Sequence, residues 1–311
     1  MDSKNEYLLL KQKYLSMRGG NDIISNDNTK CVPKLSKSKN VVKIDLDDVK
    51  FSCCEYPEGP VGMTFIHFGN TRAKIHMDVR GGWPGYINTA STNDHQFIDG
   101  ICIAGGSLLG LECVSGVMAE WLKSTDYDDF PAINGAIIYS QNFPMNKVYP
   151  DKNLGRFAFN NLSNKLYYGQ VGAGRSAAKG QGVSFYELDD GIKILAIVVN
   201  NAVGSVYRDG KVISKNNMFP ETVQSGKNTT ITTIITNLEL DNDDLRQLAH
   251  QCNAAMGSVI KPFNTFVDGD IMYTCSTHTL SKPGHYDNMK MINLYTHISD
   301  CVIEAIYNSL D

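Results

Sequence analysis

The first motif whose residue types could do chemistry is Gly169–Ser176, which reads GQVGAGRS and matches a phosphate-binding loop pattern. In that loop a lysine contacts the phosphates, and here Arg175 stands at its position. A phosphate-binding loop also opens a helix, which Gly180 and Gly182 would weaken within two turns. The overlapping Gly172-x-Gly174-x-x-Ala177 spacing fits the dinucleotide fingerprint, but no strand–helix–strand unit surrounds it. The sequence therefore predicts a close-packed backbone turn here.

A second motif, Gly105-Gly106-Ser107, lies between a predicted strand and a predicted helix, where a serine hydrolase carries its nucleophile. Leu109 replaces the closing glycine of the G-x-S-x-G pattern. Ser107 would equally serve as the N-cap of the helix that follows. Backbone N–H groups beside two glycines could bind an anion or a carbonyl oxygen. The three residues are therefore candidate substrate-binding residues, and Ser107 is an alternative nucleophile.

The third motif is Asn228-Thr229-Thr230, which begins a segment in which Thr and Ile recur as in a β-strand. It follows the polar segment 220–227, PETVQSGK, which reads as a flexible loop. A polar loop that ends directly at a strand with a buried pattern is a boundary that suits a scissile peptide bond.

The elements that must position these motifs alternate between strands and helices. Runs rich in Ile and Val predict buried strands, and apolar residues three and four apart predict amphipathic helices. The expected strands are 62–68, 74–80, 100–104, 136–139, 193–201 and 230–236. The expected helices are 108–123, 243–259 and 288–310, whereas 153–182 is expected to be loop-like. This interleaving predicts an α/β fold.

The composition is that of a globular protein and excludes several functional classes. Among the 311 residues, 42% are hydrophobic and 20% are charged, and the formal net charge is −4. Without an excess of cations, nucleic acid is not an expected partner. No apolar run approaches the roughly 20 residues of a membrane helix, so no membrane partner is expected.

The eight cysteines are expected to be reduced, because the chain is long and its start lacks the apolar region of a signal peptide. This predicts a cytoplasmic location. No C-x-x-C or H-E-x-x-H motif occurs, so a structural zinc is not expected. No other motif implies a metal or an organic cofactor. Residues 1–40 are expected to be a flexible tail, whose short helical start before Gly19-Gly20 resembles leaders on large DNA-virus proteins. Residues 41–311 are expected to form a single folded domain.

Several blocks of the sequence, in order, resemble the peptidase family that includes L-aminopeptidase D-Ala-esterase/amidase and the β-peptidyl aminopeptidases, peptidase family S58. The similarity covers about residues 62–277. The blocks are Arg80–Gly85 (RGGWPG), Asp99–Leu122 (DGICIAGGSLLGLECVSGVMAEWL), Ala136–Tyr139 (AIIY), Gly169–Gly180 (GQVGAGRSAAKG), Val199–Gly204 (VNNAVG), Asn228–Asn237 (NTTITTIITN) and Asp268–Asp270 (DGD).

The resemblance implies a four-layer α/β/β/α sandwich of the N-terminal-nucleophile type. It also implies self-cleavage between Asn228 and Thr229, which turns Thr229 into the N-terminal nucleophile. A freed threonine carries its own base, because an α-amine titrates near pH 8 and lies beside the hydroxyl. The implied activity is that of an aminopeptidase or amidase on short peptides or amino-acid amides and esters.

The resemblance also assigns supporting residues by position. Asn201, in the VNNAVG block, matches an asparagine that could donate to the oxyanion; otherwise it is a residue at the end of a strand. Tyr139 matches a tyrosine after an aliphatic strand, which is otherwise a buried aromatic residue. Asp268 and Asp270 match a turn whose carboxylate could orient the nucleophile and its amine, although most D-G-D turns lie exposed to solvent.

Three positions depart from the family pattern: 86–89 (YINT) stands where T-R-E-T is common, Ser140 replaces an aspartate, and Asn264 replaces a histidine. These changes leave the nucleophile and reshape its surroundings. The resemblance further implies a homo-oligomer, with a tetramer as the expected state. The alternatives are a serine hydrolase that uses Ser107 and a non-catalytic relative that keeps the sandwich as a binding or structural module.

Overall fold

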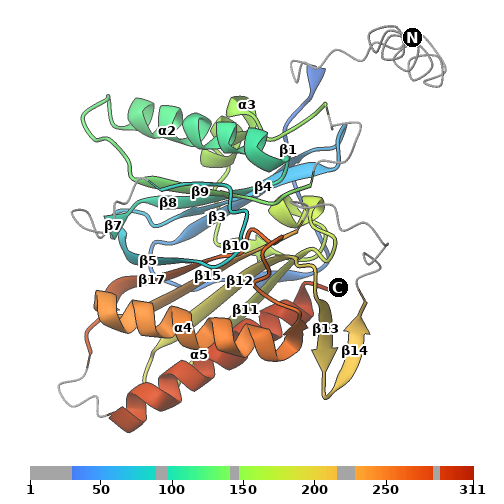
Figure 1. Ribbon diagram of the computed structural model, residues 1–311. Coiled ribbons are helices and arrows are strands. Elements are labelled where there is room, and N and C mark those ends of the chain that lie inside the picture. The colour runs from blue at the N-terminus through green and yellow to red at the C-terminus, as the bar shows by residue number, and fades with distance from the viewer. Residues whose placement is uncertain (1–29, 89–96, 141–146, 216–227, 283–287) are drawn as a thin grey trace, which may run out of the picture.

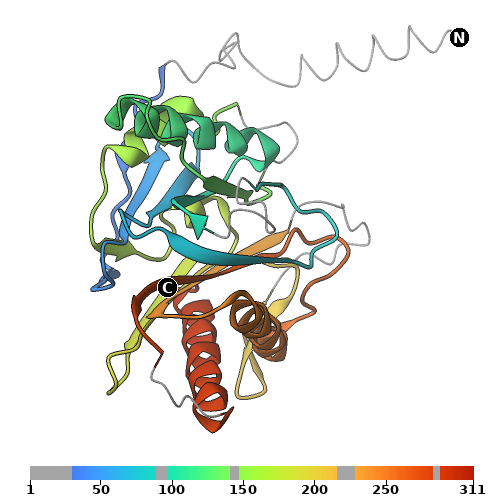
Figure 2. The same ribbon diagram turned by 90° about the vertical axis from the view of Figure 1, so that its left-hand side faces the viewer.

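The computed structural model describes residues 30–88, 97–140, 147–215, 228–282 and 288–311. Two six-stranded sheets lie face to face, with helices on the outer face of each (Figure 1). Helices α2 (Glu112–Ser124) and α3 (Lys152–Phe159) cover one sheet, and α4 (Asn242–Val259) and α5 (Asn288–Asn308) cover the other. The predicted four-layer α/β/β/α sandwich is therefore confirmed, and the view turned by 90° in Figure 2 shows the same layers.

Each sheet contains one parallel pair of strands, and its other pairs are antiparallel. The first sheet has the order β1 (Lys34–Leu35), β3 (Lys50–Tyr56), β4 (Val61–His67), β8 (Gly100–Ala104), β9 (Ile133–Ile137) and β6 (Tyr86–Ile87). The second has the order β11 (Gln181–Glu187), β12 (Lys193–Asn201), β15 (Thr229–Leu238), β17 (Ile271–Leu280), β5 (Ala73–Val79) and β7 (Phe97–Ile98).

The parallel pairs are β8 with β9 and β15 with β17, and a crossover connection joins each pair. The 3₁₀ helix η2 (Ser107–Leu111) and α2 form the first crossover, and α4 forms the second. A capping box fixes the start of α4, because Asp241 and Asp244 each accept a hydrogen bond from the other's backbone N–H. The shorter elements are β2 (Val41–Lys43), β10 (Lys165–Tyr167), η3 (Gly172–Ser176), β13 (Ser205–Arg208), β14 (Lys211–Ser214) and β16 (Ile260–Lys261).

Three hydrophobic cores fill the three spaces between the four layers. Side chains alternate along a strand, so each sheet contributes to two cores. In β12, Ile197 lies in the core between the sheets, whereas its neighbour Val198 lies in the core beneath α4 and α5. This two-sided burial explains why β8 and β12 appear in the sequence as continuous apolar runs, and both have the predicted bounds.

The structure corrects three local predictions. The segment 153–182, predicted to be loop-like, contains α3, whose first turn is capped by the Asp151 carboxylate. The predicted helix at 108–123 begins as η2, and Gly106 stands at its cap with a φ of 82°, so the predicted N-cap role of Ser107 is wrong. The strand predicted at 136–139 is β9, and Tyr139 lies beyond its end.

Candidate active site

Thr229 is the first residue of β15, a central strand of the second sheet. Ile231 and Ile235 have the same parity in the strand and pack in the core between the sheets, so the Thr229 side chain faces that space. Thr229 is only 1% exposed. Its register partner across the sheet is Asn201, the last residue of β12, so two predicted site residues lie side by side.

The carbonyl group of Asn228 accepts hydrogen bonds from two directions. The Thr229 hydroxyl donates to this oxygen at 2.5 Å, and the Gly269 N–H donates to it at 3.0 Å. An N–H aimed at a carbonyl oxygen stabilises the negative charge that develops when the carbonyl carbon is attacked. A hydroxyl group and a backbone N–H therefore converge on the Asn228–Thr229 peptide bond. Sequence reasoning missed Gly269, because a backbone N–H carries no side-chain signal.

Asp268 is fully buried, which contradicts the alternative of a solvent-exposed turn. One carboxylate oxygen accepts a hydrogen bond from the Val203 N–H at 3.2 Å. The other accepts hydrogen bonds from the backbone N–H and the hydroxyl group of Thr265. These donors compensate the carboxylate for its lost hydration and fix its position next to Gly269.

Asp270 is also buried, and it contacts Thr230, the residue after Thr229. Its Oδ1 accepts a hydrogen bond from the Thr230 N–H at 2.6 Å, and its Oδ2 accepts one from the Asn264 N–H at 3.2 Å. Burial, and then the nearby Asp268 charge, raise the pKa of Asp270 to about 8. This carboxyl group can therefore exchange a proton near neutral pH.

The glycines of the Arg80–Gly85 block let it pack directly on the Asp268–Asp270 turn. A Cβ atom on Gly81 would lie 2.2 Å from the Asp270 backbone nitrogen, so any residue other than glycine would clash with the turn. The Arg80 and Gly81 N–H groups both donate to the Asp270 carbonyl oxygen, at 3.1 and 3.2 Å. Two blocks that are remote in the sequence thus form one rigid wall beside Thr229.

Asn201 joins the second sheet to the end of the first. Its Nδ2 donates a hydrogen bond to the Tyr139 carbonyl oxygen at 3.1 Å, and its Oδ1 accepts one from the Ala178 N–H at 2.9 Å. The resemblance implies a role for the Tyr139 side chain, whereas this contact uses the Tyr139 backbone carbonyl group. The oxyanion role predicted for Asn201 remains a prediction, and its place opposite Thr229 is compatible with that role.

Sequence reasoning also missed Lys179, a buried cation close to this site. Its Nζ donates a hydrogen bond to the Ala202 carbonyl oxygen at 2.9 Å. Burial lowers the pKa of Lys179 to about 8, and the charge of Asp268 opposes part of this shift. A signal was present at the end of the Gly169–Gly180 block, where Lys179 is a charged residue between Ala178 and Gly180.

The Gly105-Gly106-Ser107 loop lies at the end of β8, and Ser140 contacts it twice. The Gly106 N–H donates to the Ser140 hydroxyl at 2.8 Å, and the Ser140 N–H donates to the Ser107 hydroxyl at 3.3 Å. A Cβ atom on Gly105 would lie 1.8 Å from the Ser176 hydroxyl, so the loop is packed closely against η3. Its substrate-binding role remains a prediction.

The phosphate-loop-like segment forms a close-packed turn, as predicted. Its helical part is η3, and Ala177 after it is extended. Gly174 packs so closely that a Cβ atom would lie 2.3 Å from the Gln181 nitrogen. Arg175, which stands at the lysine position of the pattern, forms an ion pair with Glu55 at 3.4 Å.

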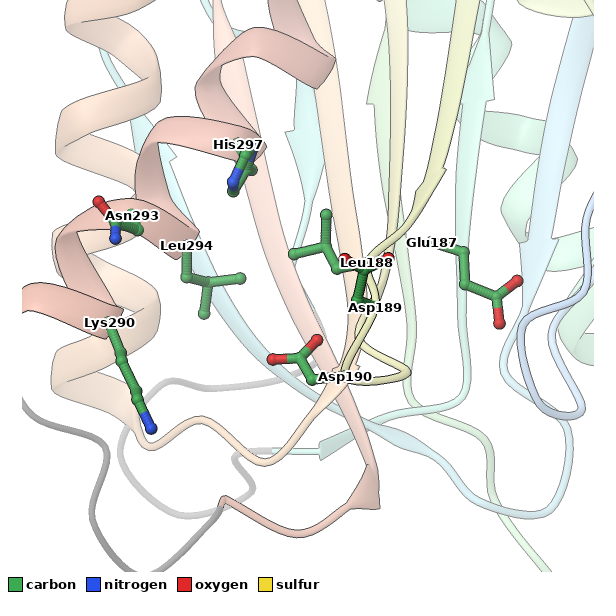
Figure 3. Close-up of a pocket in the computed structure, with 8 residues that line it drawn as sticks. All are labelled: Glu187, Leu188, Asp189, Asp190, Lys290, Asn293, Leu294 and His297. Atoms are coloured by element: carbon green, nitrogen blue, oxygen red, sulfur yellow. The ribbon is translucent and has the colours of Figure 1, made fainter.

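A cavity of about 460 Å³ lies beside the Thr229 site and is lined by Gly82, Trp83, Pro84, Gly85, Leu108, Ile137 and Tyr139. A larger cavity of about 550 Å³ lies between α5 and the turn from β11 to β12, where Figure 3 shows Asp190 and Lys290 among its lining residues. That turn is at the opposite end of the nine-residue strand β12 from Asn201, or about 25 Å of strand away. Of these two cavities, the smaller one is therefore the nearer to Thr229.

The eight cysteines, all of which the structure describes, are free thiols, and seven are buried. Among the described residues, no three His, Cys, Asp or Glu side chains are grouped so that they could hold a metal ion. Within the same ranges, no helix combines the length and apolar composition needed to cross a membrane.

Known proteins share this fold and part of this sequence. The L-aminopeptidase D-Ala-esterase/amidase of Ochrobactrum anthropi, described as a variant of the Ntn (N-terminal nucleophile) hydrolase fold, aligns with a TM-score of 0.66, 18% identity and coverage of 85% of this chain and 84% of that chain. A beta-aminopeptidase from Burkholderia sp. aligns with a TM-score of 0.68, 15% identity and coverage of 89% and 88%. The fold is thus that of the Ntn hydrolases.

In sequence, the chain is 32% identical over 295 residues to the 6-aminohexanoate-oligomer endohydrolase of Agromyces sp. (strain KY5R), covering 83% of this chain and 81% of that protein. It is 26% identical over 242 residues to an uncharacterized aminopeptidase of Mycobacterium leprae, covering 65% and 67%. The model of peptidase family S58 matches residues 44–311. The chain is therefore a hydrolase of the peptidase and amidase class, and it belongs to peptidase family S58.

Proposed function

We propose that this protein cuts its own chain between Asn228 and Thr229, and that the freed Thr229 then hydrolyses amide bonds in short peptides, amino-acid amides or amide oligomers. The observation that carries the proposal is the pair of hydrogen bonds on the Asn228 carbonyl oxygen, one from the Thr229 hydroxyl and one from the Gly269 N–H. The hydroxyl lies beside the carbonyl group that it would attack, and the oxyanion donor is already in place.

In the first step, Thr229 Oγ1 attacks the Asn228 carbonyl carbon. The C–N bond then breaks, the nitrogen gains the proton that the hydroxyl loses, and Asn228 is left esterified to Thr229. Water hydrolyses this ester to give the Asn228 carboxylate and a Thr229 that has both a free α-amine and a free hydroxyl. The cut consumes one water molecule and needs no cofactor.

In turnover, the Thr229 amine accepts the hydroxyl proton while Oγ1 attacks the substrate carbonyl carbon. The leaving amine takes a proton, and water releases the acyl group from Thr229. Asn201 lies opposite Thr229 in the sheet, a position from which its amide could donate to the substrate oxyanion. Asp270 binds the backbone of Thr230 and so holds the start of β15 in place.

Names of related proteins support two kinds of substrate. The Agromyces relative acts on 6-aminohexanoate oligomers, and the Ochrobactrum and Burkholderia structures are aminopeptidases. The substrates that these names describe all contain amide bonds, which a threonine nucleophile can hydrolyse through one acyl-enzyme route. We also propose a homotetrameric assembly, which sedimentation of the purified protein tests.

The test is an intact-mass spectrum and N-terminal sequencing of the purified protein and its variants, together with one peptide-amide assay. The unaltered protein should give pieces 1–228 and 229–311. Thr229→Ala should stay uncut and inactive, and Thr229→Ser, which keeps a hydroxyl group, should retain both reactions.

Ser107→Ala is the matched control, because it removes a different buried hydroxyl close to the same cavity. It should still cut itself and turn over substrate. A Thr229→Ala protein that cuts itself or remains active would make Ser107 the leading nucleophile. An unaltered chain that stays whole and hydrolyses nothing would identify a non-catalytic relative.

A further inference from the structure

The cavity of about 460 Å³ is lined by Trp83 and Tyr139, and the backbones of both residues contact residues that surround Thr229. On one side, the Trp83 N–H donates to the Asp268 carbonyl oxygen at 2.9 Å, so the Trp83 backbone is fixed to the Asp268–Asp270 turn. The position of a Cβ atom on Gly269 would be 2.8 Å from the Trp83 carbonyl oxygen and 2.9 Å from Thr229 Oγ1. Gly269 therefore lies between the Trp83 backbone and the Thr229 hydroxyl group.

On the other side, the cavity wall is fixed to the residue opposite Thr229. Tyr139 lines the cavity, and its carbonyl oxygen accepts the hydrogen bond from Asn201. Both walls are thus held by residues of the active site. A chain attached to Thr229 Oγ1 through an ester would have the cavity directly beside it.

The cavity wall is apolar. Trp83 and Leu108 are 57% and 62% exposed, although both are large hydrophobic residues, and Ile137 forms a buried part of the wall. None of the lining residues that the structure describes carries a charged side chain. A concave apolar surface of this size is typical of sites for small ligands, and binding an apolar group there removes exposed hydrophobic area from water.

The carboxylates near the nucleophile are already committed to other contacts. Asp268 is fully buried and accepts three hydrogen bonds, and Asp270 is buried and accepts two. The nearby cation, Lys179, would repel a positively charged substrate group. A substrate α-ammonium group placed beside Thr229 would lose its hydration, and the described wall offers no exposed carboxylate to pair with it. Burying such an unpaired charge costs binding free energy.

From these observations, we propose that the cavity, which we call the acyl pocket, binds an uncharged apolar chain on the acyl side of the scissile amide. The pocket is defined by Gly82–Gly85, Leu108, Ile137 and Tyr139. The protein then prefers amides of neutral acyl groups, such as internal bonds of an oligoamide, to amides of amino acids with a free α-ammonium group. This inference rests on the proposed function of Thr229 and goes beyond it by naming the substrate class.

A matched pair of substrates tests the preference. The p-nitroanilides of 4-methylpentanoic acid and L-leucine differ only in the α-amino group, which is charged at a pH below its pKa. We expect kcat/KM to be at least about tenfold higher for the 4-methylpentanoyl compound, as unpaired burial of a charge predicts. Equal values, or a preference for the leucyl compound, would overturn the inference.

Variants of the wall test whether the pocket sets this preference. Trp83→Ala and Leu108→Ala should each raise KM for the 4-methylpentanoyl substrate by about tenfold, since each removes apolar contact area. Trp83→Phe should restore most of the loss. The control is Phe130→Ala, because Phe130 is 69% exposed but does not line the pocket. Unchanged KM in both wall variants would contradict the assignment.

A binding measurement separates this inference from the proposed function. In the Thr229→Ala protein, calorimetry should detect 4-methylpentanamide and should find L-leucinamide at least about tenfold weaker. If the unaltered protein neither cuts itself nor hydrolyses either substrate, the proposed function fails, and this measurement still decides about the pocket. Equal binding of the two amides, or tighter binding of leucinamide, would overturn the pocket assignment whatever the activity.

Discussion

The Thr230 N–H donates a 2.6 Å hydrogen bond to Asp270 Oδ1, which ties a buried carboxyl group to the residue next to the nucleophile. This contact fixes the backbone direction at the start of β15, where Thr229 must face the space between the sheets. It also couples the nucleophile strand to the turn that supplies the Gly269 N–H. The start of β15 and that turn therefore form one unit.

Asp270 should make the folded state less stable as the pH rises. Its pKa is raised to about 8, first by burial and then by Asp268, whereas an aspartate of an unfolded chain titrates near about 3.9. The resulting stabilisation is fully present below about pH 4 and is lost as the pH rises through about 8.

Asp270→Asn cannot ionise, so its melting temperature should fall less over this pH window. Thermal unfolding of Asp270→Asn and its parent, both in the uncut Thr229→Ala background, measures the difference. Equally steep declines in the two proteins would show that Asp270 does not hold its proton in the folded state.

Gly269→Ala should slow self-cleavage strongly. The added Cβ would lie 2.9 Å from Thr229 Oγ1 and 2.8 Å from the Trp83 carbonyl oxygen, so the N–H that contacts Asn228 must shift. Gly257→Ala in α4 is the control, since its Cβ would meet only Phe263 at 4.0 Å. That change should stabilise the helix by about 1 kcal/mol and leave cleavage intact. The uncut fraction over time on a denaturing gel gives the rates, and similar rates in both variants would argue against the oxyanion role of Gly269.

Asn201→Ala should lower kcat by about a hundred- to a thousandfold, the usual effect of losing one oxyanion donor. Asn237→Ala is the matched control, because Asn237 is also a buried asparagine of the second sheet with two hydrogen bonds, to Lys193 N and Gly191 O. Both variants should lose similar stability, which thermal unfolding checks, but only Asn201→Ala should lose turnover. A comparable loss of turnover in both would reduce Asn201 to a structural residue.

The activity of the mature protein should rise with pH and then reach a plateau. The Thr229 α-amine must be neutral to accept the hydroxyl proton, and such amines titrate near about 7.7 to 8.0. Steady-state rates across this range, measured with a p-nitroanilide, give the profile. Acetylation of the α-amine should abolish activity in the cut protein, and activity that persists after acetylation would exclude the amine as the base.

The two pieces should stay together after the cut. Piece 229–311 contains β15, β17, α4 and α5, and β15 pairs with β12 of the other piece along nearly its whole length. Separation would expose the core beneath the two helices. Size-exclusion chromatography of the cut protein should therefore give one peak that contains both pieces, and a free small piece under native conditions would contradict the proposed maturation.

Part of this fold was predictable because some segments carry their own pattern. The buried runs of β8 and β12 and the amphipathic period of α4 were recognised to within a residue at each end. Helix α3 was missed because Gly155 interrupts its pattern. Tertiary packing requires this glycine, since a Cβ atom on Gly155 would lie 2.0 Å from the Cys113 carbonyl oxygen of α2. Such a contact exists only once the two helices have packed.

In the candidate site too, some residues were predictable from the sequence and others were not. The order of the motifs identified Thr229, Asn201, Asp268 and Asp270, and the structure brings these residues together at adjoining strand ends. It also adds contributions without a sequence pattern, such as the Gly269 N–H and the burial of Lys179. These two contributions depend on tertiary contacts, so the spacing of residues in the sequence does not predict them.

The position of Thr229 at the first residue of a central strand has a consequence for the folding reaction itself. Before the cut, the chain folds in a unimolecular process, and its refolding rate does not depend on concentration. If the chain is cut as proposed, the same native structure would have to be rebuilt from two separate chains, so refolding after denaturation would become second order and would fail in dilute solution. The mature protein would therefore persist through slow unfolding rather than through repeated refolding, and its working lifetime would be set by kinetic stability.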